Sequence, residues 1–286
     1  MQKLSSLAMF ALVSLSIQLE TVHAADGQRI CTPARVSLVD DCQARLSDEP
    51  ALPRVAGTSD FWQCPFPGRA AMSIANHWVR NSLEYCALTK SVYARATTAA
   101  EDMPKHYGAG EWIVFLDADE TILDNSVYQR EREACHQDWS RASWRGWVHD
   151  KMAGRVPGAA AFTRRVHDLG GVVVIVTNRD EDQDQRTQEN LCTLGIWFDY
   201  EIGMTDNHSD KADRWRHMVV LVARAGVAAP KAAMWVGDQM SDLAVLNPDG
   251  GIDRAMGQSD PGDGIGARAF LLPNPMYGTW LKNPNH

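Results

Sequence analysis

The sequence lacks the excess of positive charge that is typical of proteins that bind nucleic acids. Its 286 residues include 28 Lys and Arg against 36 Asp and Glu, so the formal net charge is −8. A protein that binds DNA or RNA normally presents a basic face to the phosphates, so we expect no nucleic-acid polymer as a partner. A small anionic substrate remains compatible with this charge, because a few local donors are enough to bind it.

The start of the chain has no hydrophobic run long enough to cross a membrane. The apolar run at residues 7–17 is shorter than the ~20 residues that a span requires. It follows Lys3 and precedes Val22-His23-Ala24, a pattern typical of a secretory signal peptide. A bacterial lipoprotein signal would end in a cysteine, and the first cysteine is Cys31, beyond this run. We therefore predict a signal peptide at residues 1–24, cleaved after about Ala24, and a periplasmic or secreted product without a membrane anchor.

The cysteines do not occur in a metal-binding pattern. The sequence has no C-x-x-C and no cysteines paired with histidines at zinc-finger spacing, which argues against a structural zinc site. An even number of cysteines in an exported protein permits disulfides, and six cysteines allow 15 connectivities. The six cysteines are Cys31, Cys42, Cys64, Cys86, Cys135 and Cys192. The sequence does not show which of them pair, or whether some are buried free thiols instead.

Three familiar functional motifs are also missing. The absence of G-x-S-x-G argues against an α/β-hydrolase with a serine nucleophile, and the absence of G-x-x-x-x-G-K-S/T argues against a P-loop ATPase. The Gly- and Asp-rich stretch 249–267 lacks the spacing and the terminal Glu of a calcium-binding loop. We interpret that stretch as a surface loop.

Four short apolar runs carry the strongest structural signal. They are continuous rather than alternating, which indicates strands buried on both faces of a parallel sheet. Helical patterns at residues 158–169, 182–195 and 211–226 separate the later runs, as in βαβ units. We predict an α/β fold with a doubly wound parallel sheet whose strands lie at residues 112–116, 172–176, 233–236 and 269–272.

The chain before the first apolar run has a different sequence pattern. Residues 25–68 show no clear period, and residues 70–100 have a helical pattern. We predict an N-terminal extension at residues 25–110, irregular and then helical, ahead of a core at residues 111–286. The oligomeric state is not indicated by the sequence.

Acidic residues follow the first and third runs. Asp117 and Asp119 come directly after residues 112–116, and two neighbouring carboxylates offer a nucleophile and a general acid or base. They also repel each other, which favours a hard cation such as Mg²⁺. Asp238 follows the third run, and Asp242 is one helical turn further on, so both could complete an oxygen shell for that cation.

Donors to an anion follow the second run. Thr177 and Asn178 stand at its end with Arg179, and these side chains are natural donors to phosphate oxygens. Ligands of open α/β sheets bind beyond the carboxyl ends of the strands, so these groups should converge with the acids. Each pattern alone also fits an ordinary helix cap or an acidic turn.

The motifs in this order resemble those of the haloacid dehalogenase (HAD) superfamily, and more closely its class C acid phosphatases, which include bacterial outer-membrane lipoprotein phosphatases. The resemblance covers about residues 70–282. Its motifs are Asp117-Ala118-Asp119-Glu120-Thr121 with residues 122–129, Trp144-Arg145-Gly146-Trp147, Val156-Pro157-Gly158-Ala159, Val176-Thr177-Asn178-Arg179, Gly237-Asp238 through Asp242, and residues 272–280. Ala118 is smaller than the residue that usually separates the two acids.

This resemblance implies a role for each motif residue. Asp117 would be the nucleophile that forms an aspartyl-phosphate, and Asp119 the general acid and then the base. Asp117, the backbone carbonyl of Asp119 and Asp238 would hold Mg²⁺, with Asp242 behind a metal-bound water or beside Lys211. Thr177, Asn178 and Lys211 would bind the transferring phosphoryl group. It also implies a small cap inserted at about residues 125–157.

The substrate that the resemblance implies is a small phosphomonoester. We predict an exported Mg²⁺-dependent acid phosphatase acting on nucleoside monophosphates or aryl phosphates, with Tyr128, Trp147 and Tyr277 as the aromatic residues that contact the substrate. The alternatives are a phosphotransferase that uses the same aspartyl-phosphate and a non-catalytic binding or storage protein of the same fold. The second alternative predicts loss of an acid, and all four acids are present.

Overall fold

The computed structural model describes residues 27–40, 42, 72–258, 260, 262 and 264–284. Its centre is a five-stranded parallel sheet with the strand order β5-β4-β1-β6-β9. The strands are β1 (Trp112–Leu116), β4 (Val172–Asp180), β5 (Tyr200–Met204), β6 (Lys231–Gly237) and β9 (Ala269–Leu271). The predicted α/β fold with a doubly wound parallel sheet is therefore confirmed.

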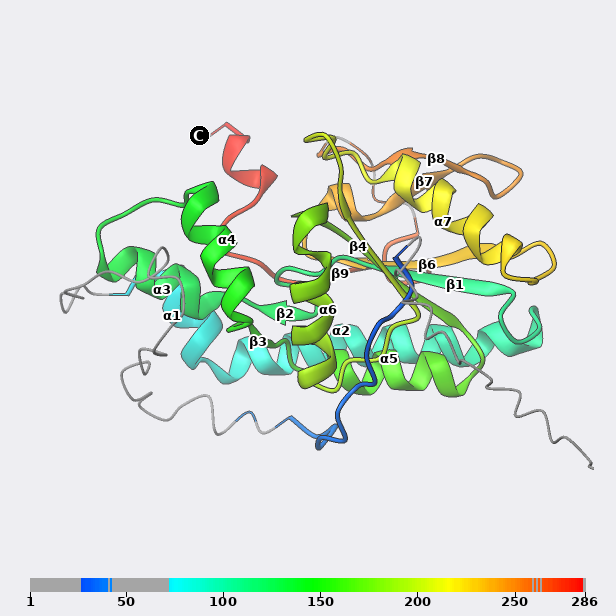
Figure 1. Cartoon of the computed structure of the whole chain (residues 1–286), viewed down its shortest axis with the longest axis horizontal. Coiled ribbons are helices and arrows are strands. Elements are labelled where there is room, and N and C mark those ends of the chain that lie inside the picture. The colour runs from blue at the N-terminus through cyan, green and yellow to red at the C-terminus, as the bar shows by residue number, and fades with distance from the viewer. Residues whose placement is uncertain are drawn as a thin grey trace, which may run out of the picture.

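Helices cover both faces of this sheet (Figure 1). Along β1, Val114 and Leu116 pack into the cluster that includes the buried side chains of α2, α5 and α6, while Ile113 and Phe115 pack against α7. This alternation follows from the two-residue period of a strand and explains why all five residues of β1 are buried. The helices are α2 (Leu83–Asp102), α5 (Ala159–Asp168), α6 (Asp184–Thr193) and α7 (Ala212–Arg224).

The N-terminal helical pattern resolves into two helices. Ser73 caps α1 (Ile74–Asn81), and Ser82 caps α2, each accepting a hydrogen bond from a backbone N–H of the first turn. A 3₁₀ turn, η3 (Met103–Lys105), ends this region. The predicted helix at residues 70–100 is thus interrupted at Ser82, because the serine side chain satisfies the start of a new helix.

A helical segment with a small antiparallel strand pair lies between β1 and β4. It contains β2 (Leu123–Asp124), α3 (Ser126–Ala134), α4 (Arg141–Asp150) and β3 (Gly154–Arg155), and β2 pairs with β3 antiparallel. A second antiparallel pair, β7 (Ala244–Leu246) with β8 (Ile252–Ala255), follows β6. Short 3₁₀ turns complete the fold: η4 (Glu181–Gln183), η5 (Met240–Asp242) and η6 (Thr279–Lys282).

The segment at residues 27–40 is tied to the core at several points. Gln28 forms an isolated antiparallel bridge with Tyr200 on the edge strand β5. Further along, the carboxylate of Asp40 accepts hydrogen bonds from Arg155 and from the backbone N–H of Gly158. These contacts connect the N-terminal segment to β5, to β3 and to the start of α5.

Disulfides add covalent links between distant parts of the chain. Cys31 is bonded to Cys192 at the end of α6, and Cys42 is bonded to Cys86 in α2. Cys135 is also disulfide-bonded, while Cys64 lies outside the described residues. The predicted signal peptide at residues 1–24 lies outside them too. Within the described part of the chain, no helix is both long and apolar enough to cross a membrane.

Candidate active site

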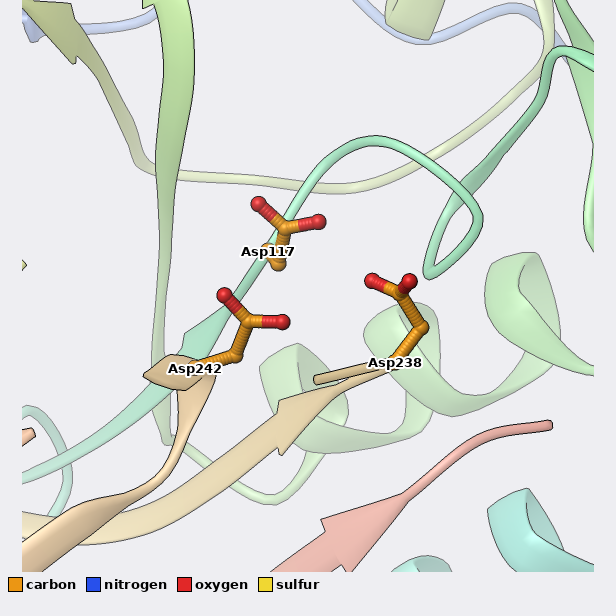
Figure 2. Close-up of side chains that lie close together, drawn as sticks. All are labelled: Asp117, Asp238 and Asp242. Atoms are coloured by element: carbon orange, nitrogen blue, oxygen red, sulfur yellow. The ribbon is translucent and has the colours of Figure 1, made fainter. Parts of the chain in front are cut away.

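Three carboxylates gather where β1 and β6 end. Asp117 follows β1, Asp238 follows β6, and Asp242 lies in η5; all three are buried. One oxygen of each lies within 4.8 Å of the others, and Figure 2 shows the three side chains next to one another. Neighbouring strands of the parallel sheet bring the first two together, as expected for the carboxyl edge of such a sheet.

A buried lysine neutralises part of this cluster. The Lys211 Nζ donates hydrogen bonds to Asp117 Oδ1 and, at 2.8 Å, to Asp242 Oδ1. Burial alone would lower the pKa of Lys211, but the charges of Asp117 and Asp242 raise it above its ordinary value. The close approach of Asp242 also explains Gly237, since a Cβ at that position would lie 2.1 Å from the Cβ of Asp242.

The cluster carries more negative charge than the lysine balances. Burial raises the pKa of Asp117 to about 7; Asp242 and Asp119 act in the same direction, and Lys211 opposes them. Burial and the charges of Asp242 and Asp117 raise the pKa of Asp238 well above its ordinary value. Crowded buried carboxylates of this kind fit a divalent cation, because such an ion prefers oxygen ligands and would relieve their repulsion.

Asp238 is oriented by two neighbours. Asn274 Nδ2 donates a hydrogen bond to Asp238 Oδ2 at 2.8 Å, and the hydroxyl of Thr121 donates to Oδ1 at 3.4 Å. The Oδ1 of Asn274 accepts hydrogen bonds from the backbone N–H groups of Met276 and Tyr277. Asn274 therefore links a carboxylate of the cluster to the turn that carries Tyr277. The sequence motif contained Asn274, but spacing alone gave it no role.

The carboxylate of Asp119 lies outside the three-carboxylate cluster. It accepts hydrogen bonds from Arg179, at 2.7 Å for the shortest, and from Asn125 at 2.8 Å. The backbone turns directly after it, because Glu120 has a φ of 56°, in the left-handed region. Asp119 and Asp117 nevertheless line the same cavity, so the predicted acid and the predicted nucleophile remain neighbours.

The predicted phosphate-binding residues differ in their exposure to the cavity. Asn178 is exposed and lines the cavity together with Lys211, whereas Thr177 is fully buried and its hydroxyl accepts a hydrogen bond from the Arg179 N–H. Arg214 donates to the Thr177 carbonyl and, at 2.5 Å, to Asn178 Oδ1, and so fixes the amide of Asn178. Arg214 was not predicted as a site residue, although its three-residue spacing from Lys211 could have identified it.

The cavity that these residues share has a volume of about 700 Å³. The buried residues Asp117, Lys211 and Asp242 line it, and its aromatic lining consists of Trp139, Trp144 and Tyr277. The remaining lining residues are largely polar: Asp119, Gln129, Asn178, Ser209, Asp210, Gln239, Ser241, Ala255 and Thr279. A cavity of this size fits a small ester with one ring system.

Two of the three predicted substrate aromatics lie elsewhere. Tyr128 and Trp147 are completely buried, so no substrate can contact them in this structure, and their prediction is corrected. The Tyr128 hydroxyl hydrogen-bonds Ser143 at 2.7 Å, and the Trp147 indole N–H donates to Asn125 Oδ1 at 2.7 Å. Position in a functional motif therefore did not show where these side chains point. Tyr277 does line the cavity.

Comparisons with known proteins agree with this geometry. The family model of the HAD superfamily, subfamily IIIB (acid phosphatase), matches residues 65–280. Acid phosphatase 1 of Solanum lycopersicum is 26% identical over 190 residues, which cover 65% of this chain and 63% of that protein. The chain thus spans less than two thirds of the length of this curated relative.

Solved structures show the same fold. Two structures of the class C acid phosphatase from Bacillus anthracis, one of them with tungstate bound, superpose with a TM-score of 0.60. They are 22% and 21% identical in sequence, and each match covers 72% of this chain and 85% of the other. Because the family model spans most of the chain, from residue 65 to residue 280, the protein belongs to the acid phosphatases of HAD subfamily IIIB.

Proposed function

We propose that the protein is a Mg²⁺-dependent acid phosphatase that hydrolyses small phosphate monoesters through an aspartyl-phosphate. The observation that carries this proposal is the cluster of Asp117, Asp238 and Asp242. Lys211 hydrogen-bonds two of these carboxylates, Asp117 and Asp242, and lines one cavity together with them. Family membership and the acid phosphatase names of the relatives support it. We propose nucleoside monophosphates and aryl phosphates as the substrate class, because aromatic side chains line the same cavity.

Asp117 and Asp119 perform the covalent chemistry in this proposal. A carboxylate oxygen of Asp117 attacks phosphorus while the bond to the leaving oxygen breaks, and Asp119 gives that oxygen a proton. Asp119 then takes a proton from the water that attacks the aspartyl-phosphate, which releases phosphate and restores Asp117. Phosphoryl transfer of this kind depends mainly on alignment and on stabilising the charge of the phosphoryl oxygens.

The remaining residues hold and neutralise the phosphoryl group. Lys211 and Asn178 face the cavity as donors, and Arg214 keeps the Asn178 amide in place. Asp117, Asp238 and the backbone carbonyl of Asp119 would hold Mg²⁺, with Asp242 beside it, and the bound ion would offset charge on the transferring group. Removal of the ion should leave the buried carboxylates of the cluster repelling one another.

Activity measurements test this proposal. The purified protein should release phosphate from 4-nitrophenyl phosphate and 5′-AMP, EDTA should stop the release, and Mg²⁺ should restore it. Asp117→Asn should abolish turnover, while Asp168→Asn, which removes an exposed carboxylate at the end of α5, should not. Full activity of Asp117→Asn would disprove the assignment of the nucleophile. Addition of an acceptor alcohol would reveal a phosphotransferase by formation of a new ester.

We also propose that the protein is exported and loses residues 1–24. The disulfides between Cys31 and Cys192 and between Cys42 and Cys86 support this, because such bonds persist in oxidising compartments. Intact-mass measurement of the exported protein should give a chain that begins at about Ala25. A retained or acylated N-terminus would contradict this proposal.

A further inference from the structure

The two carboxylate oxygens of Asp119 have unequal surroundings. Oδ1 accepts from Arg179 Nη2 at 2.7 Å, from Arg179 Nε at 3.1 Å and from Asn125 Nδ2 at 2.8 Å. Oδ2 accepts a single hydrogen bond from the described residues, from Arg179 Nε at 3.1 Å. Since a carboxylate oxygen has two lone pairs, Oδ1 is saturated and Oδ2 retains capacity for a proton.

Arg179 is held firmly enough to impose this asymmetry. It lies near the end of β4 and is only 2% exposed, and its Nη1 donates to Thr187 Oγ1 on α6 at 3.2 Å. The ring of Trp144 lies 5.5 Å from its guanidinium carbon. Of the carboxylates in the described part of the chain, Asp119 is the one that forms an ion pair with this guanidinium. A buried arginine is costly unless it is paired, so this geometry is strongly determined.

Asn125 is fixed from the opposite side. Trp147 Nε1 donates to Asn125 Oδ1 at 2.7 Å, and the Asn125 backbone N–H donates to Glu120 Oε1 at 2.9 Å. Because the amide oxygen accepts from Trp147, the amide nitrogen faces Asp119. Both Asn125 and Trp147 are completely buried. Trp147 belongs to α4, so the packing of α4 affects the carboxylate of Asp119 through the side chain of Asn125.

We propose that Arg179 and Asn125 are positioning residues that occupy Oδ1 of Asp119 and leave Oδ2 as the oxygen that transfers the proton. This inference rests on the proposed function. As the bond between phosphorus and the leaving oxygen breaks, the proton moves from Oδ2 to that oxygen, which yields an alcohol and the Asp119 carboxylate. In the second half-reaction, Oδ2 takes the proton of the attacking water, and the bond between Asp117 and phosphorus breaks.

Two substitutions that preserve charge isolate this positioning. Trp147→Phe removes the indole N–H that orients Asn125 and keeps a ring in the core, and Arg179→Lys keeps the cation but loses the two-pronged contact with Asp119. Arg145→Lys is the matched control, because Arg145 pairs with Asp180 and Asp182 at a half-buried position on α4. Circular dichroism and thermal melting show whether each variant is folded.

The readout is kcat/KM for esters that differ in their need for an acid. An alkyl ester such as 5′-AMP or glycerol 2-phosphate requires a proton on its leaving oxygen, whereas 4-nitrophenolate departs without one. General acid catalysis contributes roughly 10²–10⁴-fold. We therefore expect Arg179→Lys to lower kcat/KM for the alkyl esters by about 100-fold, but for 4-nitrophenyl phosphate by less than about 5-fold. Trp147→Phe should cause a smaller loss with the same selectivity.

Double variants provide the decisive comparison. In an Asp119→Asn background there is no proton to position, so Arg179→Lys should cause little further loss on the alkyl esters. An equal fall on both ester types, or full additivity with Asp119→Asn, would overturn the inference and leave Arg179 a structural residue. If Arg179→Lys does not fold, Trp147→Phe alone decides by its selectivity between the esters. Hydrolysis of neither ester by the unaltered enzyme would instead refute the proposed function.

Discussion

Asp184 provides the sharpest test of how buried acids set the pH range of stability. It begins α6, and burial is the main cause that raises its pKa to about 7; the charges of Glu181 and Asp182 act in the same direction, and Arg214 and a hydrogen bond from the Gly203 N–H oppose them. The completely buried Glu201 lies near it, and burial and the charge of Asp184 raise the pKa of Glu201 well above its ordinary value. The folded protein therefore holds a proton on Asp184 that the unfolded chain releases at lower pH.

The sign of the effect follows from linkage. The folded-state pKa of Asp184 is about 7 and its ordinary pKa is 3.8, so the stabilisation is fully present below pH 3.8 and is lost as the pH rises through 7. A difference of about three pKa units corresponds to about 4 kcal/mol in the free energy of unfolding. Asp184→Asn keeps a neutral side chain at every pH, so this loss should not occur in the variant. We expect similar melting temperatures at pH 4 and an Asn variant that melts roughly 10 °C higher at pH 8.

Thermal melting followed by circular dichroism from pH 4 to pH 8 in EDTA measures this difference. Because the carboxylates of the active site are present in both proteins, their titration cancels in the comparison. Asp168→Asn is the control for the loss of a surface carboxylate and should melt in parallel with the unaltered protein. Parallel curves for Asp184→Asn and the unaltered protein would refute the reasoning, since they would mean that Asp184 binds the same number of protons in the folded and unfolded states.

Three further outcomes are expected. Asn274→Ala should weaken Mg²⁺ affinity by about 10–100-fold in calorimetric titration, because it removes the hydrogen bond that orients Asp238; unchanged affinity would contradict that role. Lys211→Met should lower the free energy of unfolding in EDTA by about 3 kcal/mol, since buried carboxylates lose their cation, and Mg²⁺ should restore part of it; an unchanged denaturant midpoint would exclude this. Double replacement of Cys31 and Cys192 by Ser should cost about 3–5 kcal/mol, because the bond closes a span of 161 residues, and an unaltered melting temperature would show that the non-covalent contacts suffice.

The sequence was most informative about the strands that are buried on both faces. Continuous apolar runs located β1, β4, β6 and β9, and the polar residues after them located Asp117, Asp238 and Asp242. The edge strand β5 was not predicted, because its residues Tyr-Glu-Ile-Gly-Met mix polar and apolar positions. Burial alternates along β5, with Glu201 and Gly203 buried and the other three residues half-buried, so its sequence shows no continuous apolar run.

Residues that act through tertiary contacts could not be placed in this way. Asn274 reaches Asp238 across the fold, and no spacing in the chain encodes that contact. The spacing of Arg214 from Lys211 places it near the site, but its contact with Asn178 is visible only in the structure. The same limit explains why Tyr128 and Trp147 were wrongly predicted to contact the substrate. Both lie in motifs of the family, but their side chains are buried in the core. The disulfide between Cys31 and Cys192 joins segments far apart in the sequence, and counting the cysteines left all 15 connectivities of six cysteines open.

In the proposed mechanism, the sheet and the segment inserted after β1 position different catalytic groups. The proposed nucleophile Asp117 and the carboxylate of Asp238 follow the ends of β1 and β6, where central strands fix the backbone, and Asp242 lies in η5. The proposed acid is held by Arg179 from β4 and by Asn125, whose amide is oriented by Trp147 in α4. Changes in the packing of α4 should therefore affect proton transfer to the leaving group before they affect the cation site. Cation affinity and dependence on the leaving group are thus separable by substitution.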